Sequence, residues 1–249
     1  MSRLSKVLTG VFVAALCVPV PQAQAALVDR GGGMLYDTVL NVTWLQDANY
    51  AKTSNYDADG RMTWTQANTW ANNLNYGGYS SGWRLARNTP VNGTLAGWNY
   101  NDSFDGSTDV SYNITSTFSE LSYMYYVNLG LKGYYSTSGN PQSGWGIFGN
   151  GTYGGQNNVG LVRNLQSYVY WSGTAYAPSP ADLAWYFGAN SGYQDNYVQS
   201  DGFFAWAVRP GDVTVAAVPV PGSVALLAGG LALLGVVTRR RWRLGASET

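Results

Sequence analysis

The chain has 249 residues with 14 basic and 14 acidic side chains, so its formal net charge is zero, and only 11% of its residues are charged. It contains no histidine and one cysteine, which excludes a Ser-His-Asp or Cys-His catalytic site, the usual zinc ligands and a disulfide within the chain. Aromatic residues make up 14% of the sequence, and low charge combined with many aromatics is typical of folded rather than disordered chains.

The N-terminus has the pattern of a secretory signal peptide. A positively charged start, a short apolar stretch and a small-x-small cleavage site follow one another as Arg3 and Lys6, then Val7–Val18, then Ala23-Gln24-Ala25. We therefore predict that residues 1–25 are removed by signal peptidase, with cleavage after Ala25, and that the protein is exported. Cys17 leaves with this segment, so the mature protein contains no cysteine.

Residues 26–217 form the predicted extracellular domain, and a segment of this length is sufficient for one hydrophobic core. Six basic residues (Arg3, Lys6 and the four arginines after position 238) and one acidic residue, Glu248, lie outside it. The domain therefore has eight basic and thirteen acidic residues and a net charge near −5. A negative charge of this size argues against nucleic acid as a partner.

The first elements predicted in the domain are short strands and an amphipathic helix. Met34–Asp37 and Val42–Leu45 have strand composition on either side of a turn at Asn41. Four apolar residues at helical spacing predict a helix over Trp64–Leu74 with Thr63 as its N-cap: Trp64, Ala67, Ala71 and Leu74.

A third short strand is predicted at Trp83-Arg84-Leu85. Arg84 either pairs with an acidic neighbour or is a half-exposed strand residue, and we favour the second interpretation. The segment that follows, residues 87–116, is polar with glycine and aspartate, which predicts an inserted surface loop.

The second half of the domain begins with another predicted helix. Thr117-Phe118-Ser119-Glu120 matches a capping box, and the helix that it opens has Gly130 as its stop and one apolar face: Phe118, Leu121, Tyr125 and Leu129. Residues 133–160 are a second glycine-rich loop region. Strands are predicted at Tyr168–Ser172, Ala184–Phe187, Tyr193–Val198 and Phe203–Val208. Runs of strands with two helices favour an α+β fold.

The order of these motifs resembles the Lcl C-terminal domain family, which takes its name from the terminal domain of a bacterial collagen-like adhesin. Ala86 stands where the familiar form has proline, and two long loops interrupt the match. The resemblance implies a C-type-lectin-like fold of short antiparallel strands with two helices and long loops, and a secreted or surface domain that is often ligand-binding. It spans most of Met34–Pro210 and is carried by Asp37-Thr38, Thr43-Trp44-Leu45, the Trp64 helix, Gly82-Trp83-Arg84-Leu85, Tyr170-Trp171-Ser172-Gly173-Thr174, Ala184-Trp185-Tyr186-Phe187 and Ala207-Val208-Arg209-Pro210.

The end of the chain combines prolines, an apolar run and a cationic cluster. Val218–Thr238 is 21 residues without a charge, about the ~20 residues that a membrane helix needs. Pro219 and Pro221 bar a helix across them, and the arginines of residues 239–243 favour the cytoplasmic side. We therefore predict a transmembrane helix over about 222–238, a short cytoplasmic end at 244–249 and the domain on the periplasmic side; the alternative is a buried core helix.

Residues 218–243 resemble the PEP-CTERM sorting signal, which the membrane protease exosortase processes in Gram-negative bacteria that make extracellular polysaccharide. Val220 replaces the glutamate of the family's Val-Pro-Glu-Pro, between Pro219 and Pro221. The resemblance implies a temporary anchor and a final location at the cell surface or in the extracellular matrix. If Val220 blocks processing, the protein stays a single-pass membrane protein.

One spacing in the domain resembles a metal site. Asn55, Asp57 and Asp59 place oxygen-bearing side chains at alternate positions before Gly60, as in the first half of a calcium loop. Gln66 stands at the twelfth position in place of glutamate, so a calcium ion would bind weakly. The alternative is a polar Asx-type turn that leads into the helix. A looser cluster consists of Asp102, Asp105, Gly106 and Asp109.

Aromatic side chains in loops are the candidates for ligand contact. Trp145 and Tyr153 lie in the second glycine-rich region, where they either bind a ligand or anchor the loop. Trp171, Trp185 and Trp206 lie in strand patterns and are predicted to be core residues.

These features predict a non-catalytic surface or matrix protein with a lectin-like domain, possible partners being glycan or exopolysaccharide. Two alternatives stay open. One is a structural matrix component without a discrete ligand. The other is an aspartate-based, polysaccharide-acting enzyme, which needs two facing carboxylates about 5–10 Å apart.

Overall fold

The computed structural model describes residues 27–94 and 97–213. The predicted cleavage site at Ala23–Ala25, the prolines at 219 and 221, and the predicted membrane helix lie outside these residues. Among the residues described, no helix has both the length and the apolar character that crossing a membrane requires. The architecture is mixed α+β and consists mostly of strands, as the sequence predicts at this level.

The first sheet is formed by the two ends of the domain. All its neighbouring strands are antiparallel, and Val208 of the last strand lies between Trp44 and Arg84 of its two neighbours. In spatial order the strands are β1 (Leu27–Asp29), β2 (Met34–Asp37), β3 (Val42–Leu45), β14 (Ala207–Pro210) and β5 (Arg84–Leu85). The predicted hairpin is confirmed, with Asn41 at a φ of 51° in its turn.

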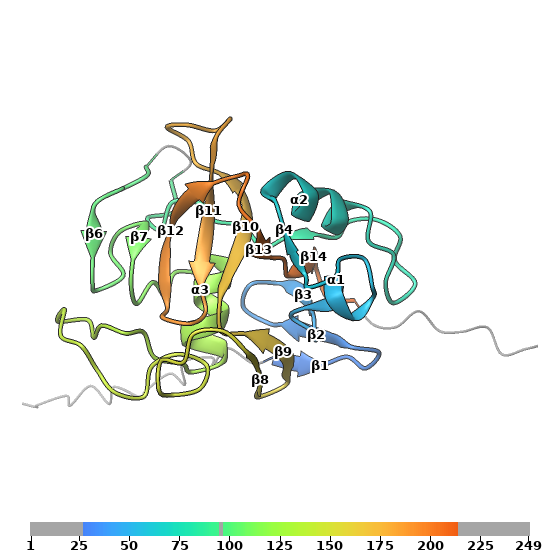
Figure 1. Cartoon of the computed structure of the whole chain (residues 1–249), viewed down its shortest axis with the longest axis horizontal. Helices are drawn as coiled ribbons and strands as arrows, with labels where there is room; N and C mark the ends of the chain where they lie inside the picture. The colour runs from blue at the N-terminus through green and yellow to red at the C-terminus, as the bar shows by residue number, and fades with distance from the viewer. Residues whose placement is uncertain (1–26, 95–96, 214–249) are drawn as a thin grey trace, which may run out of the picture.

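The second, larger sheet has seven strands, and its centre is the antiparallel set of β10, β11 and β12 (Figure 1). Two of its pairings, of β10 with β13 and of β6 with β7, are parallel. In spatial order the strands are β4 (Arg61–Met62), β13 (Phe203–Phe204), β10 (Val169–Ala175), β11 (Leu183–Gly188), β12 (Tyr193–Val198), β7 (Val110–Ser111) and β6 (Asp102–Ser103). The strand predicted at Phe203–Val208 is thus divided between the two sheets as β13 and β14.

A separate hairpin of β8 (Gln156–Val159) and β9 (Val162–Gln166) lies within and just after the region predicted as glycine-rich loop. The sequence analysis missed both strands. Gly160 turns the chain between them at a φ of 56°, which glycine adopts without steric cost.

The helices are short. The predicted helix at Trp64 is confirmed as α2 (Trp64–Asn72), and Thr63 is its N-cap in a capping box with Gln66. A one-turn helix that was not predicted, α1 (Tyr50–Thr53), precedes it. The third helix, α3 (Glu120–Tyr123), continues as one π-helical stretch, η1 (Met124–Asn128), and Gly130 follows it at a φ of 60°.

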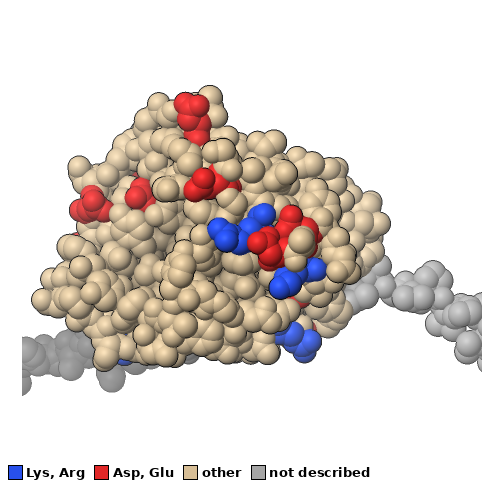
Figure 2. All heavy atoms as spheres, viewed as in Figure 1, with Lys and Arg blue, Asp and Glu red and all other residues tan. Residues whose placement is uncertain are grey.

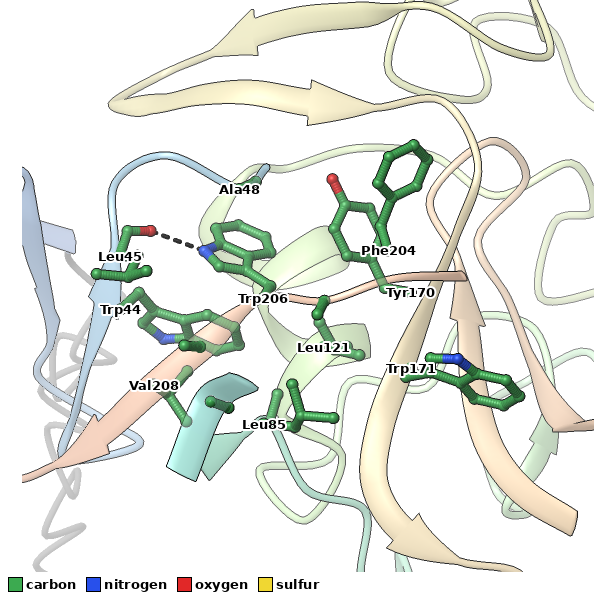
Figure 3. Packing of buried hydrophobic residues seen from close by; sticks show 14 of the residues in the cluster. Trp44, Leu45, Ala48, Leu85, Leu121, Tyr170, Trp171, Phe204, Trp206 and Val208 are labelled. Carbon is green, nitrogen blue, oxygen red and sulfur yellow. Dashed lines mark hydrogen bonds between the residues drawn. The ribbon is translucent and has the colours of Figure 1, made fainter. Parts of the chain in front are cut away.

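Tryptophan and tyrosine side chains fill the core between the sheets (Figure 3). Trp44 and Trp206 pack with ring centroids 4.8 Å apart, and the indole N–H of Trp206 donates to the Leu45 carbonyl at 2.7 Å. Trp171 donates to the Met62 carbonyl at 2.9 Å. Trp171, Trp185 and Trp206 are all buried, which confirms the prediction that they are core residues.

The segment of residues 87–116, here called the insertion, is not the plain surface loop that the sequence predicts. Its strands β6 and β7 extend the large sheet beyond β12. Asp109 and Ile114 are fully buried, and Trp98 stacks on Trp185 of β11 with centroids 5.0 Å apart and an interplanar angle of 20°. Tertiary packing has therefore ordered a segment whose composition is that of a loop.

Two predictions at the end of the insertion are wrong. The N-cap of α3 is Ser119 rather than Thr117, and its side chain makes no capping hydrogen bond. Glu120, predicted to cap the helix, instead accepts two hydrogen bonds from the guanidinium of Arg84, at 2.7 and 2.8 Å. Arg84 is therefore ion-paired with Glu120 and not merely a half-exposed strand residue. The Arg84 side chain is 14% exposed and that of Glu120 is 13% exposed.

This ion pair generates a stability prediction. Replacing Glu120 with Ala removes the acceptor of the Arg87 backbone N–H, which donates to Glu120 at 2.7 Å. It also removes the counter-charge of the largely buried Arg84 guanidinium, which keeps its bond to the Leu85 carbonyl at 3.0 Å. We expect Glu120→Ala to lower the free energy of unfolding by about 3–5 kcal/mol, measured by urea denaturation. A matched control is Asp212→Ala, which removes an exposed pair with Arg30 and is expected to cost clearly less. Equal losses in the two variants would contradict the structural role given to Glu120.

Candidate ligand-binding site

An open pocket of about 590 Å³ lies between α1, the segment that follows it and the β8–β9 hairpin. Its lining combines amides, a carboxylate, a hydroxyl and an ammonium group: Asn49, Lys52, Thr53, Asn55, Asp57, Ala58, Gln156 and Asn164. Such groups supply both hydrogen-bond donors and hydrogen-bond acceptors. The pocket therefore suits a polar, hydroxyl-rich ligand better than an apolar one.

Asp47 holds the two sides of the pocket together. One of its carboxylate oxygens accepts from the hydroxyl of Thr53 at 2.6 Å and from the side-chain amide of Asn164 at 2.9 Å. The other accepts from the backbone N–H of Asn49 at 2.8 Å. Asp47 itself follows β3, so a single carboxylate fixes α1 and β9 relative to the first sheet.

Asn49, which lines the pocket, lies directly against Gly60. The Asn49 side chain is only 3% exposed. Gly60 has a φ of 87°, and a Cβ built on it would lie 1.9 Å from Oδ1 of Asn49. Only glycine fits here, because any side chain would both collide with Asn49 and strain the backbone.

The three residues predicted to bind calcium do not all line this pocket. Asn55 and Asp57 do, whereas Asp59 does not appear among the lining residues. Asp57 Oδ1 accepts from the backbone N–H groups of Asp59 at 3.1 Å and of Gly60 at 2.8 Å. Asp59 Oδ1 accepts from that of Arg61 at 2.9 Å. These bonds match the alternative of Asx-type turns.

The twelfth position of the calcium pattern is also engaged elsewhere. Gln66 Oε1 accepts from the backbone N–H of Thr63 at 3.0 Å, as the capping box requires. Within the described ranges, no three His, Cys, Asp or Glu side chains gather closely enough to hold a metal ion. Calcium binding by Asn55, Asp57 and Asp59 stays a prediction.

The aspartates of the looser cluster have separate structural partners. Asp109 is buried and accepts from the backbone N–H groups of Val91 and Asn99, both at 2.7 Å, and burial raises its pKa above the ordinary value. Asp105 accepts from Ser103 and Ser107, and these hydrogen bonds lower its pKa to about 2. Asp102 Oδ1 accepts a hydrogen bond from the Tyr193 hydroxyl at 3.2 Å.

The two loop aromatics predicted to contact a ligand have different surroundings. Trp145 is half-buried, packs edge-on against Tyr134 with centroids 4.9 Å apart, and lies directly against Gly151. This contact corresponds to the loop-anchoring alternative. Tyr153 is 64% exposed and rests on Tyr168 with centroids 5.0 Å apart. Tyr153 is therefore the more accessible of the two rings.

Tyr153 belongs to the chain segment that borders the pocket, since it precedes Gln156 by three residues. Beside it, the guanidinium of Arg61 lies 4.4 Å from the centroid of Tyr168 and donates to its hydroxyl at 2.8 Å. Tyr56, between the two pocket residues Asn55 and Asp57, is also 55% exposed. Exposed rings thus occur on both chain segments that flank the pocket.

Charged side chains are sparse on the face shown in Figure 2, and basic and acidic groups gather together near α1 and the segment after it. This region contributes Lys52, Asp57, Asp59 and Arg61. Because both signs occur there, the pocket is not a strongly anionic or cationic surface.

Sequence reasoning missed six of the lining residues: Asn49, Lys52, Thr53, Ala58, Gln156 and Asn164. Gln156 and Asn164 come from the β8–β9 hairpin, whose polar strands carry no apolar alternation. Asn164 reaches the pocket with a φ of 53°, a conformation that asparagine tolerates better than most residues. No local signal joins these positions to α1, more than a hundred residues earlier.

Comparison of the chain with protein-family models, with curated proteins and with solved structures gives no match. The resemblances to the Lcl C-terminal domain family and to the PEP-CTERM signal stay predictions.

The contact between Asn49 and Gly60 can be tested by substitution. Gly60→Ala introduces a Cβ into the space of the Asn49 amide, so we expect lower stability and a lower melting temperature than for a glycine-to-alanine change in open space. Gly154→Ala is the matched control, because Gly154 has a similar φ of 81° and nothing within 4 Å of its built Cβ. The left-handed backbone alone costs about 1–2 kcal/mol, and thermal unfolding of both variants isolates the additional cost of the collision. Identical losses would show that Asn49 moves aside freely.

Proposed function

We propose that the protein is an exported, surface- or matrix-associated, non-catalytic protein whose domain binds a polysaccharide in the pocket between α1 and the β8–β9 hairpin. The observation that carries this proposal is the lining of that pocket. Its side chains offer amide, hydroxyl, carboxylate and ammonium groups, which can pair with the many hydroxyls of a sugar.

Exposed tyrosines beside the pocket support the same ligand class. Tyr56 and Tyr153 expose more than half of their surface, and aromatic rings provide flat apolar area with a polar edge. Tyr153 packs on Tyr168, and the guanidinium of Arg61 lies over the ring of Tyr168. A ring fixed in this way can cover the apolar face of a sugar while the pocket binds its hydroxyls.

The terminal segments support the proposed location. A signal peptide over residues 1–25 would export the domain through signal peptidase, and the tail over residues 218–243 would insert as a membrane helix. Processing by an exosortase-type protease near Pro219 and Pro221 would then release the domain to the cell surface or the extracellular matrix. The finer fold assignment, a C-type-lectin-like domain, belongs to this proposal as well.

The alternative of a structural matrix component has one observation in its favour. Many loop oxygens are already used inside the domain, as the carboxylates of Asp47, Asp57 and Asp109 illustrate. A domain of this kind could contribute bulk and stability without a discrete ligand. Binding measurements separate the two proposals directly.

We expect the purified full chain to be retained on at least one immobilised matrix polysaccharide, assayed across a panel with and without calcium. The double variant Lys52→Ala/Gln156→Ala removes two pocket groups, and the loss of each hydrogen bond weakens binding by about three- to tenfold. Lys132→Ala is the matched control, since it removes an exposed lysine that does not line the pocket. Retention on no polysaccharide would favour the structural component, and equal retention of all variants would place the binding site elsewhere.

The proposed sorting is tested by mass. In cells that contain an exosortase-type protease, the mature protein is expected to lack both residues 1–25 and the apolar tail. In cells without the protease, the tail should stay attached. An intact tail in both cells would indicate that Val220 prevents processing and that the protein remains anchored in the membrane.

A further inference from the structure

Two carboxylates from distant parts of the chain meet at one hydroxyl group. The Tyr193 hydroxyl lies 3.2 Å from Oδ1 of Asp102 and 3.4 Å from Oδ2 of Asp195. The two oxygens are therefore separated by no more than the sum of these distances. A tyrosine hydroxyl carries one proton, so it can satisfy only one of the two carboxylates at a time.

This contact links the outermost strand of the large sheet to β12. Asp102 lies on β6, the edge strand, which pairs only with the two-residue strand β7. β7 in turn pairs with β12 through Ser111 and Gln194. The contact at Tyr193 is therefore a direct connection between β6 and β12 that does not run through β7.

We propose that Asp102, Tyr193 and Asp195 form a pH-dependent latch, which holds the insertion against β12 when Asp195 carries a proton and loosens it when Asp195 is ionised. In the first state β6 stays attached at the edge of the large sheet. In the second state, repulsion between Asp195 and the carboxylate of Asp102 favours detachment of β6.

The electrostatic surroundings of Asp195 support this direction of the pH effect, closed at low pH and open at high pH. Its pKa is raised, first by burial and further by the charge of Asp102, while hydrogen bonds from Asn196 and Tyr193 partly lower it. The other titratable groups that interact with these residues come from the neighbouring elements and are all tyrosines: Tyr112 after β7, Tyr176 after β10 and Tyr186 on β11. Among residues 27–94 and 97–213, no lysine or arginine contributes to the interactions acting on Asp195.

The direction of the pH effect follows from linkage. A carboxyl whose pKa is raised in the closed state binds its proton more tightly there than in the open state. Closing is therefore favoured as the pH falls through the raised pKa and disfavoured once the pH exceeds it. The tyrosines stay neutral over this range, because burial raises the pKa of Tyr112 to about 12 and that of Tyr193 above its ordinary value.

The geometry favours a latch over a catalytic pair. In a glycoside-cleaving enzyme the bond to be cut lies between two carboxylates. Here the hydroxyl of Tyr193 occupies that space and lies within hydrogen-bonding distance of both groups. The contact therefore holds two parts of the protein together.

Hydrogen exchange of the full chain tests the latch. The amides of Asp109 and Tyr112 donate to Asn99 and Ser103, and the amide of Asn99 donates to Asp109. We expect the protection factors of these amides, corrected for intrinsic exchange, to rise about three- to tenfold as the pH falls from about 7 to below the ordinary aspartate pKa of 3.8. Amides in the central strand β10 should not change in the same ratio, because the effect is local.

Three variants distinguish this latch from other sources of pH dependence. Asp195→Asn removes the titrating group and should abolish the response, whereas Asp201→Asn, which changes a carboxylate just beyond β12, should preserve it. Asp109→Asn removes the carboxylate acceptor of the Asn99 amide, so in this variant the response is read from the Tyr112 amide, which donates to the Ser103 carbonyl and should keep its pH dependence. The proposal is overturned if wild-type protection is independent of pH, if β10 responds equally, or if Asp109→Asn rather than Asp195→Asn removes the effect.

Discussion

The carboxylate of Glu120, which follows the insertion, accepts hydrogen bonds from Arg84, which precedes it, and from Arg87, its first residue. The backbones of the same two residues are also joined, since the N–H of Glu120 donates to the Arg87 carbonyl at 3.0 Å. The two ends of the insertion thus leave and re-enter the domain at one point. This point also joins β5 of the first sheet to α3, so the ion pair fixes the helix that packs against the large sheet through Tyr125 and Phe187.

A domain without cysteine must obtain this order from packing alone. Indole and phenol rings provide large apolar areas, and each carries one polar atom that needs a partner. Trp64, Trp171 and Trp206 meet this need by donating to backbone carbonyls of other elements at 2.7–2.9 Å. Each of these rings therefore specifies a position along a neighbouring element as well as filling space. We consider these directed contacts to be the counterpart of the disulfides that exported proteins commonly use.

The sequence predicts best those elements whose determinants are local. Thr63 and Gln66 form the expected capping box of α2, because both partners lie within one helical turn. The same pattern at Thr117 and Glu120 misleads, because Arg84, 36 residues away, takes the glutamate. Likewise, the aromatic-containing strands β10 to β12 are recognisable. Strands β8 and β9, and with them the pocket residues Gln156 and Asn164, have no local signature. The spacing of asparagine and aspartate at residues 55–59 fits both a turn and a metal site, and the sequence alone does not choose between them.

The side-chain oxygens that bind backbone N–H groups also limit where a ligand can bind. Loop carboxylates in this domain first satisfy backbone N–H groups: Asp37 accepts from Val39 and Leu40, and Asp109 accepts from Val91 and Asn99. A carboxylate that positions its own loop is poorly suited to reorganise around a ligand, since releasing it would leave backbone donors unsatisfied. Under the proposed function, we therefore expect recognition to fall to side chains that do not hold the backbone. The exposed Lys52, Tyr56 and Tyr153 are of this kind, and all three come from the segments on either side of one pocket.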